Sequence, residues 1–376
     1  MTPAAHQPPS RAARPAPAAF GVDLALAGAR LSVTSATVDL IEHVSAVMVP
    51  PCRKSSCTPS PDWYLRLENA VALADEEVDV LFADRPLLSF PHGGPRLAIV
   101  RDSGGHLQAV GRYRPQSAAV CISVDVAEHR THIMLPAGDQ EAIRWADYVA
   151  RVFFASRMQA SGWRMLHASA VVLDGTAVLF LAAQGGGKST LAHRACTELG
   201  ARFLADDLVL VSGEGTVVGW PTRVALSAEL VRSARANLGT VTAGARRDRV
   251  VFSPAEHRAA FGMAYSLPVP LGALVCVKSG VHAADPVAAQ ASVLGATARE
   301  TFVAKAADVP AQRLFVSDLV GLTGGPPPSR NGAVFDTDGR LCEVPAVLLT
   351  VGDLFGLTRA PVWEALAPLL SQFGRL

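Results

Sequence analysis

The sequence predicts an α/β protein in which a β-rich domain precedes a mixed α/β domain with a glycine-rich loop. The chain has 376 residues, whereas one domain usually holds about 100 to 200, so two domains are expected. Hydrophobic residues make up 50% and charged residues 18%, a balance typical of folded chains. In the second half an apolar run, three consecutive glycines and a helical pattern follow one another, as expected of a phosphate site.

Changes in composition and pattern divide the chain. We expect a disordered tail rich in Ala and Pro over residues 1–19, a β-rich domain over 20–139 and the phosphate-binding domain over 140–376. Alternating apolar and polar residues predict short strands throughout Phe20–Val49. Further strands are expected at Leu97–Val100, Ala118–Val124 and His132–Leu135. Together these strands are expected to form one antiparallel domain.

The second half alternates strand and helix patterns. Helical spacing from Gln140 to Gln159 predicts a helix that bridges the two domains. Two apolar runs then flank Asp174 and Gly175, a pair that typically closes a hairpin. A helix over Thr190–Leu199 is expected to end at Gly200. The other candidates are strands at Ala201–Leu204, Leu208–Val211, Val217–Gly219, Leu271–Val277 and Val344–Thr350, and helices near Ala228–Leu238, Val293–Ala306 and Pro361–Phe373.

The charge balance argues against nucleic-acid and membrane partners. Lys and Arg number 34 against 33 Asp and Glu, and the net charge is +1, so no large positive field attracts polyanions. The first 19 residues lack the apolar core of a signal peptide, and no apolar run reaches the about 18 residues of a membrane helix. We therefore expect a cytoplasmic protein that binds neither nucleic acid nor membrane.

The glycine-rich loop is the strongest chemical signal. Phosphates need glycines whose backbone N–H groups can approach the anion, a lysine for the β and γ phosphates and a hydroxyl for a magnesium ion. The loop that meets these needs comprises Gln184, Gly185, Gly186, Gly187, Lys188, Ser189 and Thr190. The pattern departs from the usual one at Ala182, where the first glycine is expected. An ordinary glycine-rich turn before a helix is the alternative.

Two carboxylates and a histidine flank this loop in sequence. Asp206 and Asp207 follow a strand and would be costly to bury unpaired, so a metal ion or a basic partner is expected beside them. One could hold Mg²⁺ while the other accepts a proton, and a solvated turn is the alternative. His167 precedes the hairpin and, taken alone, is more often structural than catalytic.

Arginines further along the chain could contact the transferred phosphate or the acceptor. The densest basic run comprises Arg246, Arg247 and Arg249, and Arg223 is a second candidate. A solvated loop after a helix explains the run equally well.

The order and spacing of these residues resemble the catalytic core of the HPr serine kinase/phosphorylase family. The resemblance extends over about His167 to Leu226 and covers Lys188, Ser189, Asp206 and Asp207. It implies a mixed-sheet P-loop domain of the type shared with phosphoenolpyruvate carboxykinases, in which His167 contacts Asp206 or Asp207. The amino-terminal region does not resemble the regulatory domain of the bacterial enzyme. The chain looks more like divergent HPr kinase-related proteins found with peptide or natural-product biosynthesis.

Residues and resemblance together predict an ATP- and Mg²⁺-dependent kinase. The acceptor is expected to be a hydroxyl on a peptide, a protein or a small molecule, and a homo-oligomer is compatible with the sequence. Two alternatives come from other classes. One is a nucleotide-binding regulatory protein without turnover, and the other is an ATPase acting on nucleic acid, which the net charge of +1 disfavours.

Overall fold

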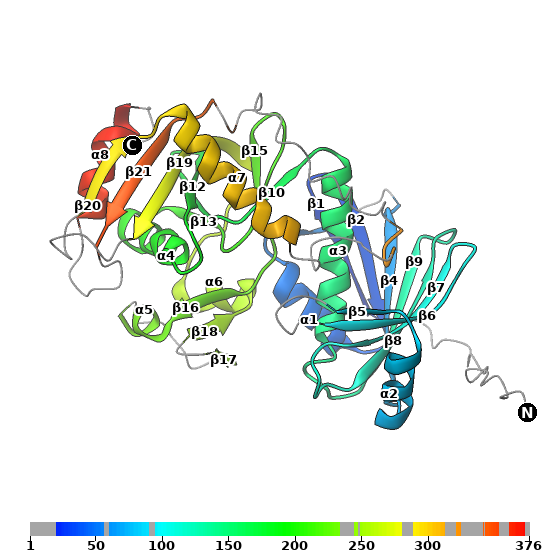
Figure 1. The fold of residues 1–376 in the computed structure, drawn as a ribbon. Coiled ribbons are helices and arrows are strands. Elements are labelled where there is room, and N and C mark those ends of the chain that lie inside the picture. The colour runs from blue at the N-terminus through cyan, green and yellow to red at the C-terminus, as the bar shows by residue number, and fades with distance from the viewer. Residues whose placement is uncertain are drawn as a thin grey trace, which may run out of the picture.

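The computed structural model describes residues 20–55, 60–89, 95–233, 244–246, 249–279, 289–312, 321–324, 341, 343–352 and 361–372. Within them the chain forms two nine-stranded sheets and a three-stranded sheet (Figure 1). The first large sheet and its helices form one half of the molecule, and the other two sheets form the second half. Among the described helices, none combines the length and the apolar character needed to span a membrane. The expected mixed α/β architecture is therefore confirmed.

The first half is built on a sheet with the strand order β3-β1-β2-β4-β9-β8-β7-β6-β5. Its elements are β1 (Phe20–Leu26), β2 (Ala29–Ser35), α1 (Val38–Met48), β3 (Arg53–Ser55), β4 (Trp63–Ala70), α2 (Asp75–Asp84), β5 (Leu87–Ser89), β6 (Arg96–Ser103), β7 (His106–Arg112), β8 (Ala119–Asp125), β9 (Arg130–Pro136) and α3 (Arg144–Ala160). The expectation of a wholly antiparallel domain is wrong, because β4 pairs in parallel with both β2 and β9. These long-range pairings bring strands from distant parts of the sequence together, which alternation of apolar residues alone does not specify.

The strands predicted throughout Phe20–Val49 need a second correction, because α1 occupies the last part of that range. Its buried residues are Leu40, Ile41, Val44, Val47 and Met48. Their spacing places them on one face of a helix, so these apolar residues form a helical stripe and not the alternation of a strand. Tertiary burial of that stripe outweighs the β-propensity of its valines.

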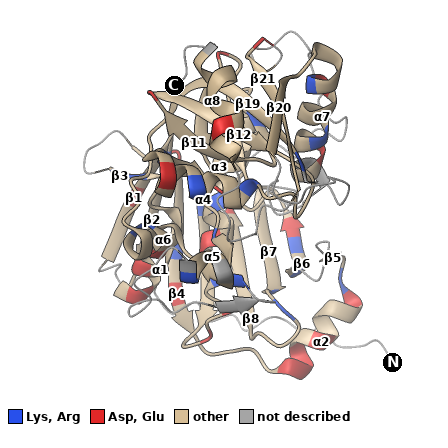
Figure 2. Ribbon diagram, turned by 90° about the vertical axis from the view of Figure 1, so that its left-hand side faces the viewer, with Lys and Arg blue, Asp and Glu red and all other residues tan. Residues whose placement is uncertain are grey.

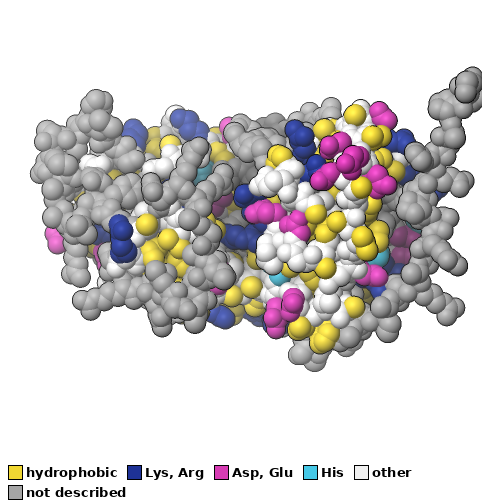
Figure 3. Space-filling model, turned by 90° about the horizontal axis from the view of Figure 1, so that it is seen from below, with side chains coloured by type: hydrophobic (Ala, Val, Ile, Leu, Met, Phe, Trp, Pro, Cys, Tyr) yellow, Lys and Arg dark blue, Asp and Glu magenta, His cyan; other side chains and the backbone are white. Residues whose placement is uncertain are grey.

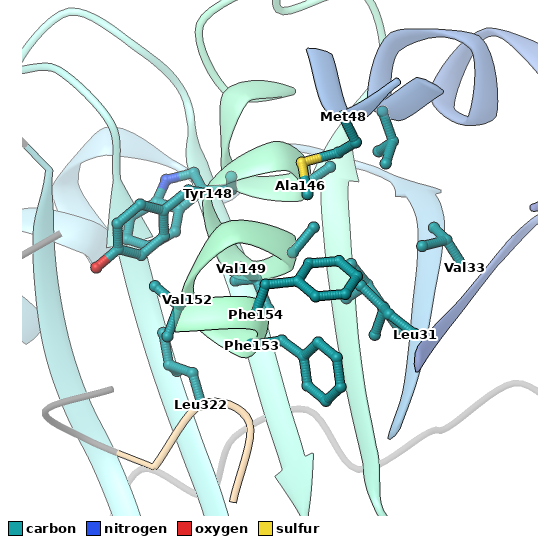
Figure 4. Packing of buried hydrophobic residues seen from close by; sticks show 14 of the residues in the cluster. Leu31, Val33, Met48, Ala146, Tyr148, Val149, Val152, Phe153, Phe154 and Leu322 are labelled. Atoms are coloured by element: carbon teal, nitrogen blue, oxygen red, sulfur yellow. The ribbon is translucent and has the colours of Figure 1, made fainter. Parts of the chain in front are cut away.

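Helix α3 packs on the first sheet, with apolar residues facing α1 and β2 (Figure 4). Phe153 and Phe154 are fully buried in this cluster, which also contains Leu322 from far along the chain and Leu210 from the second half. The helix predicted from Gln140 to Gln159 therefore exists, and its apolar face belongs to the core of the first half. That cluster extends to residues of the second half such as Leu210, while the second half also holds two hydrophobic clusters of its own.

The second large sheet has the order β10-β14-β15-β19-β12-β11-β13, with β21 pairing β19 and β20 pairing β21. Its strands are β10 (Arg164–Leu166), β11 (Ser169–Leu173), β12 (Thr176–Leu181), β13 (Arg202–Ala205), β14 (Val209–Val211), β15 (Thr216–Gly219), β19 (Val269–Ser279), β20 (Ala289–Val293) and β21 (Ala346–Val351). The hairpin at Asp174 and Gly175 is confirmed, since both residues have a positive φ between paired strands β11 and β12. Helix α4 (Lys188–Leu199) ends at Gly200 in the left-handed conformation, as predicted.

A three-stranded sheet and further helices complete the second half. The strands are β16 (Val224–Ser227), β17 (Gly244–Arg246) and β18 (Arg249–Phe252), in the order β16-β18-β17. The helices are α5 (Ala228–Ser233), α6 (Pro254–Phe261), α7 (Ala296–Gln312) and α8 (Val362–Gln372). The small sheet lies below α4 in Figure 1, and β16 lines the pocket at the start of that helix.

Candidate functional site

The glycine loop joins β12 to α4, the strand–loop–helix order that the sequence predicted. Gly185 and Gly187 have φ values of 77° and 86°, a left-handed conformation that side chains disfavour. Gly187 is the N-cap of α4, so the unpaired N–H groups and the positive end of the helix dipole face the loop. This arrangement is suited to binding an anion.

The alanine at the position of the usual first glycine fits the loop for a steric reason. Ala182 does not have a positive φ, so its conformation does not require glycine. A Cβ added at Gly186 would lie 2.8 Å from the Ala182 Cβ and 3.0 Å from the Ala183 carbonyl oxygen. The methyl group of Ala182 thus uses the space that Gly186 leaves open.

Lys188 lies inside the loop. Its ammonium donates hydrogen bonds to the carbonyl oxygens of Ala182 and Ala183, at 3.0 and 3.1 Å. The residue is only 6% exposed, so its charge lies in the pocket wall rather than in bulk water. A buried ammonium beside a helix N-terminus reinforces the positive potential at this end of α4.

Asp206, at the end of β13, is buried and strongly hydrogen-bonded. The Ser169 hydroxyl donates to its carboxylate at 2.8 Å, and the Ser189 hydroxyl and the Ala225 N–H donate as well. Burial, with a further contribution from the charge of Asp207, raises the pKa of the Asp206 carboxyl above its usual value, although these hydrogen bonds oppose the rise. Desolvation therefore changes the pKa of Asp206 more than the three hydrogen bonds do.

Asp207 faces the pocket instead. Its φ of 65° is left-handed, a conformation that Asp tolerates better than most residues and that often accompanies functional sites. Its carboxylate lies 3.1 Å from Nε2 of His167, which is buried in the segment between β10 and β11. The backbone N–H of His167 donates to the Ala306 carbonyl oxygen at 2.7 Å, which fixes the histidine against α7.

These residues surround one pocket. Its walls comprise His167, Gln184, Gly185, Gly186, Gly187, Lys188, Ser189, Thr190, Asp207, Ala225, Leu226, Ser227 and Arg249. The structure thus brings together the loop, the histidine, one aspartate and one arginine from the sequence prediction, while Asp206 lies behind Ser189. Basic and acidic residues are otherwise mixed over the ribbon (Figure 2).

Of the other predicted arginines that the structure describes, Arg223 does not line this wall. The guanidinium of Arg223 lies 3.3 to 3.4 Å from the carboxylate oxygens of Asp147 on α3. Arg246 is the last residue of β17, and its side chain, like the whole of Arg247, lies outside the described residues. Among the described residues of the basic run, only Arg249 lines the pocket.

Sequence reasoning missed several residues of the site. Three of them donate hydrogen bonds to Asp206. The hydroxyl of Ser169 and the N–H of Ala225 donate to its carboxylate, and the hydroxyl of Thr222 donates to its carbonyl oxygen at 2.8 Å. The period-two spacing of Val224 and Leu226, both buried in β16, is a sequence signal that could have indicated a strand there. No signal in the sequence connects Ser169 or Thr222 to the aspartate, because only the fold brings these segments together.

Comparisons with known proteins add little to this geometry. No family model matches the chain, and no curated protein matches it. A solved structure of the Hpr(Ser) kinase/phosphatase from Coxiella burnetii is similar to 56% of this chain and 93% of its own, with 11% sequence identity and a TM-score of 0.27. At that TM-score the similarity indicates at most a distant relationship, and the functional inference rests on the pocket.

Proposed function

We propose that this chain binds ATP with Mg²⁺ and transfers the γ-phosphoryl group to the hydroxyl of an acceptor. The observation that carries the proposal is the convergence of Lys188, Ser189, Asp207 and His167 on one pocket at the N-terminus of α4. An anion-binding loop alone would serve any nucleotide-binding protein. An oriented carboxylate beside that loop supports phosphoryl transfer.

The loop holds the phosphates in this proposal. Backbone N–H groups of Gly185 and Gly187 surround them, and Lys188 supplies a positive charge from the pocket wall. The N–H of Gly186 donates instead to the Ala183 carbonyl oxygen at 3.0 Å, which holds the turn of the loop. Arg249, which reaches the pocket from β18, supplies a second positive group for the migrating phosphoryl. Fixed hydrogen-bond donors of the protein thereby replace the water around the phosphates before the reaction begins.

Asp207 is the proton acceptor in this proposal. The acceptor oxygen forms a bond to the γ phosphorus, the bond from that phosphorus to the bridging oxygen breaks, ADP leaves and the hydroxyl proton passes to the Asp207 carboxylate. His167, 3.1 Å away, holds that carboxylate in position. Correct placement of the hydroxyl contributes more than basicity, because the transition state of phosphoryl transfer is loose.

The residues present fit a magnesium ion. Ser189 and the two aspartates offer oxygen ligands, which Mg²⁺ prefers, and a divalent cation offsets the repulsion between adjacent carboxylates. Among the described residues no group of three or more His, Cys, Asp or Glu could hold a metal by itself. Phosphate oxygens and water would therefore complete the ligand set, and the bound ion would neutralise charge on the phosphates.

For the acceptor, the proposal specifies only the chemical class, an alcohol. A serine of a peptide or protein and a small-molecule alcohol present the same hydroxyl to Asp207. The alternative function, nucleotide binding without turnover, needs the loop but not the pairing of Asp207 with His167.

The test compares Lys188→Ala and Ser189→Ala with wild type for ATP binding by calorimetry and for turnover of ATP against candidate acceptors. Lys305→Ala, which removes an exposed lysine from α7, is the matched control. We expect both loop variants to lose turnover while the control keeps it. Retained ATP binding and turnover in Lys188→Ala would refute the proposal, whereas ATP binding by wild type with no turnover on any acceptor would favour the regulatory alternative.

A further inference from the structure

A carboxylate with no exposed surface lies where the two halves of the molecule meet. Asp147, on α3, is 0% exposed. His43 on α1 lies 2.9 Å from Oδ1, and Arg151, one turn further along α3, donates to Oδ2 at 2.7 Å. Arg223 approaches both oxygens from the second half, at 3.3 and 3.4 Å. Viewed from below, basic side chains are seen in the hollow between the halves (Figure 3).

The positive groups around Asp147 outweigh the cost of burying it. Burial alone would raise the pKa of its carboxyl, but the charges of Arg223 and Arg151 and the hydrogen bond from His43 hold that pKa well below its usual range. Asp147 is therefore an anion in the folded protein. Removing every positive partner of such a group is strongly destabilising, while removing one of several leaves it compensated.

Arg223 lies in the segment that holds Asp206. Its preceding neighbour Thr222 donates to the Asp206 carbonyl oxygen, and Ala225, two residues later, donates its N–H to the Asp206 carboxylate. The arginine is thus flanked on both sides by contacts to one aspartate. Its side chain extends the other way, to α3 of the first half. A displacement of Arg223 would move both donors together, because they are joined to it by one or two peptide units.

We propose that the Asp147–Arg223 ion pair is a positioning device, through which the first half of the molecule fixes the Asp206 carboxylate behind Ser189 of the phosphate pocket. The inference rests on the proposed function, in which Asp206 is one of the oxygen ligands offered to the magnesium ion, together with Ser189 and Asp207. Ser189 donates to Asp206, so a shift of this carboxylate also disturbs the hydroxyl of the loop. The two arginines of the cluster have different roles, since Arg151 lies on the same helix as Asp147 whereas Arg223 connects that helix to the pocket.

The experiment measures ATP affinity by calorimetry with and without Mg²⁺, in wild type, Arg223→Gln and Arg151→Gln. Asp147 keeps Arg151 and His43 in the first variant and Arg223 and His43 in the second, so both variants should fold. We expect Arg223→Gln to reduce the enhancement of ATP affinity by Mg²⁺ about 10-fold, the size typical of losing support for a metal ligand, with little change in affinity without Mg²⁺. Arg151→Gln should behave as wild type, and Arg223→Lys should recover part of the loss.

The outcomes separate this inference from the proposed function. Absence of any Mg²⁺ enhancement in wild type would refute the proposed function itself. Enhancement in wild type that persists in Arg223→Gln would overturn the positioning role. Equal losses in Arg223→Gln and Arg151→Gln would also overturn it, because the effect would then come from the stability of the whole cluster. Weaker ATP binding by Arg223→Gln in the absence of Mg²⁺ would indicate a direct phosphate contact by Arg223 instead.

Discussion

Two buried histidines, one on α4 and one on α6, are expected to make the fold sensitive to acid. His193 on α4 and His257 on α6 are both 0% exposed, with ring centroids 5.8 Å apart. Burial lowers the pKa of His193 from 6.5 to about 4, although Glu198 opposes the change, and burial together with His193 lowers that of His257 to about 3. Both imidazoles are therefore neutral in the folded protein near neutral pH.

The sign of the pH effect follows from these shifts. At each histidine the folded state binds protons less readily than the unfolded state. Each histidine therefore lowers the free energy of unfolding as the pH falls below 6.5. This loss stops growing only when the pH is below the pKa of the histidine in the folded state. At pH 5 the unfolded imidazole is almost fully protonated, so linkage gives about 2 kcal/mol lost per histidine relative to pH 7. Asp206, whose pKa burial raises, acts in the opposite direction.

The variant His193→Phe isolates this contribution. Among the described residues neither ring nitrogen of His193 has a hydrogen-bond partner, and its ring meets Phe261 edge-on at 4.6 Å. Phenylalanine therefore keeps the aromatic contact and loses none of the hydrogen bonds that the structure describes. We expect the variant to be at least as stable as wild type at pH 7 and to gain about 2 kcal/mol over it at pH 5.

The measurement is urea denaturation of both proteins at pH 7 and pH 5, with His106→Gln, which removes a histidine whose side chain is 60% exposed, as control. If the difference in free energy of unfolding between His193→Phe and wild type does not change with pH, the reasoning is refuted. Such a result would show that His193 binds protons equally in the folded and unfolded states. If the free energy of unfolding of His106→Gln differs from that of wild type with a similar pH dependence, the change in stability comes from the net charge of the protein.

Three further predictions follow from single positions. Gly186→Ala should weaken ATP binding, measured by calorimetry, because the added methyl collides with Ala182 and the loop must move; unchanged affinity would contradict the assigned loop geometry. Gly219→Ala should lower the free energy of unfolding in urea by about 3 kcal/mol, because its Cβ would overlap the backbone of β13, whereas Gly213→Ala, with open space at its Cβ, should cost little. Asp207→Asn should lower kcat for ATP turnover about 100-fold with little change in ATP affinity, and near-normal kcat would remove Asp207 as the proton acceptor.

Local signals in the sequence determined the loop and its surroundings. The hairpin at Asp174 and Gly175, the glycine loop and the end of α4 at Gly200 all depend on conformations that a few neighbouring residues fix. Such conformations are limited by sterics within the chain itself, so they can be predicted from short segments. The chemical roles of the loop residues remain predictions.

Only the tertiary structure decided how distant segments combine. Apolar residues at Val38–Met48 fit a strand or a helix until the sheet beneath them is known, and the parallel partners of β4 leave no mark in its sequence. Neighbouring aspartates have different environments, because Asp206 is buried behind Ser189 whereas Asp207, in a left-handed turn, lines the pocket. Arg223, a candidate phosphate ligand by charge alone, binds Asp147 instead. Charge and apolar pattern define what a side chain can bind, but its partner is selected by long-range packing, which arises only when the whole chain folds.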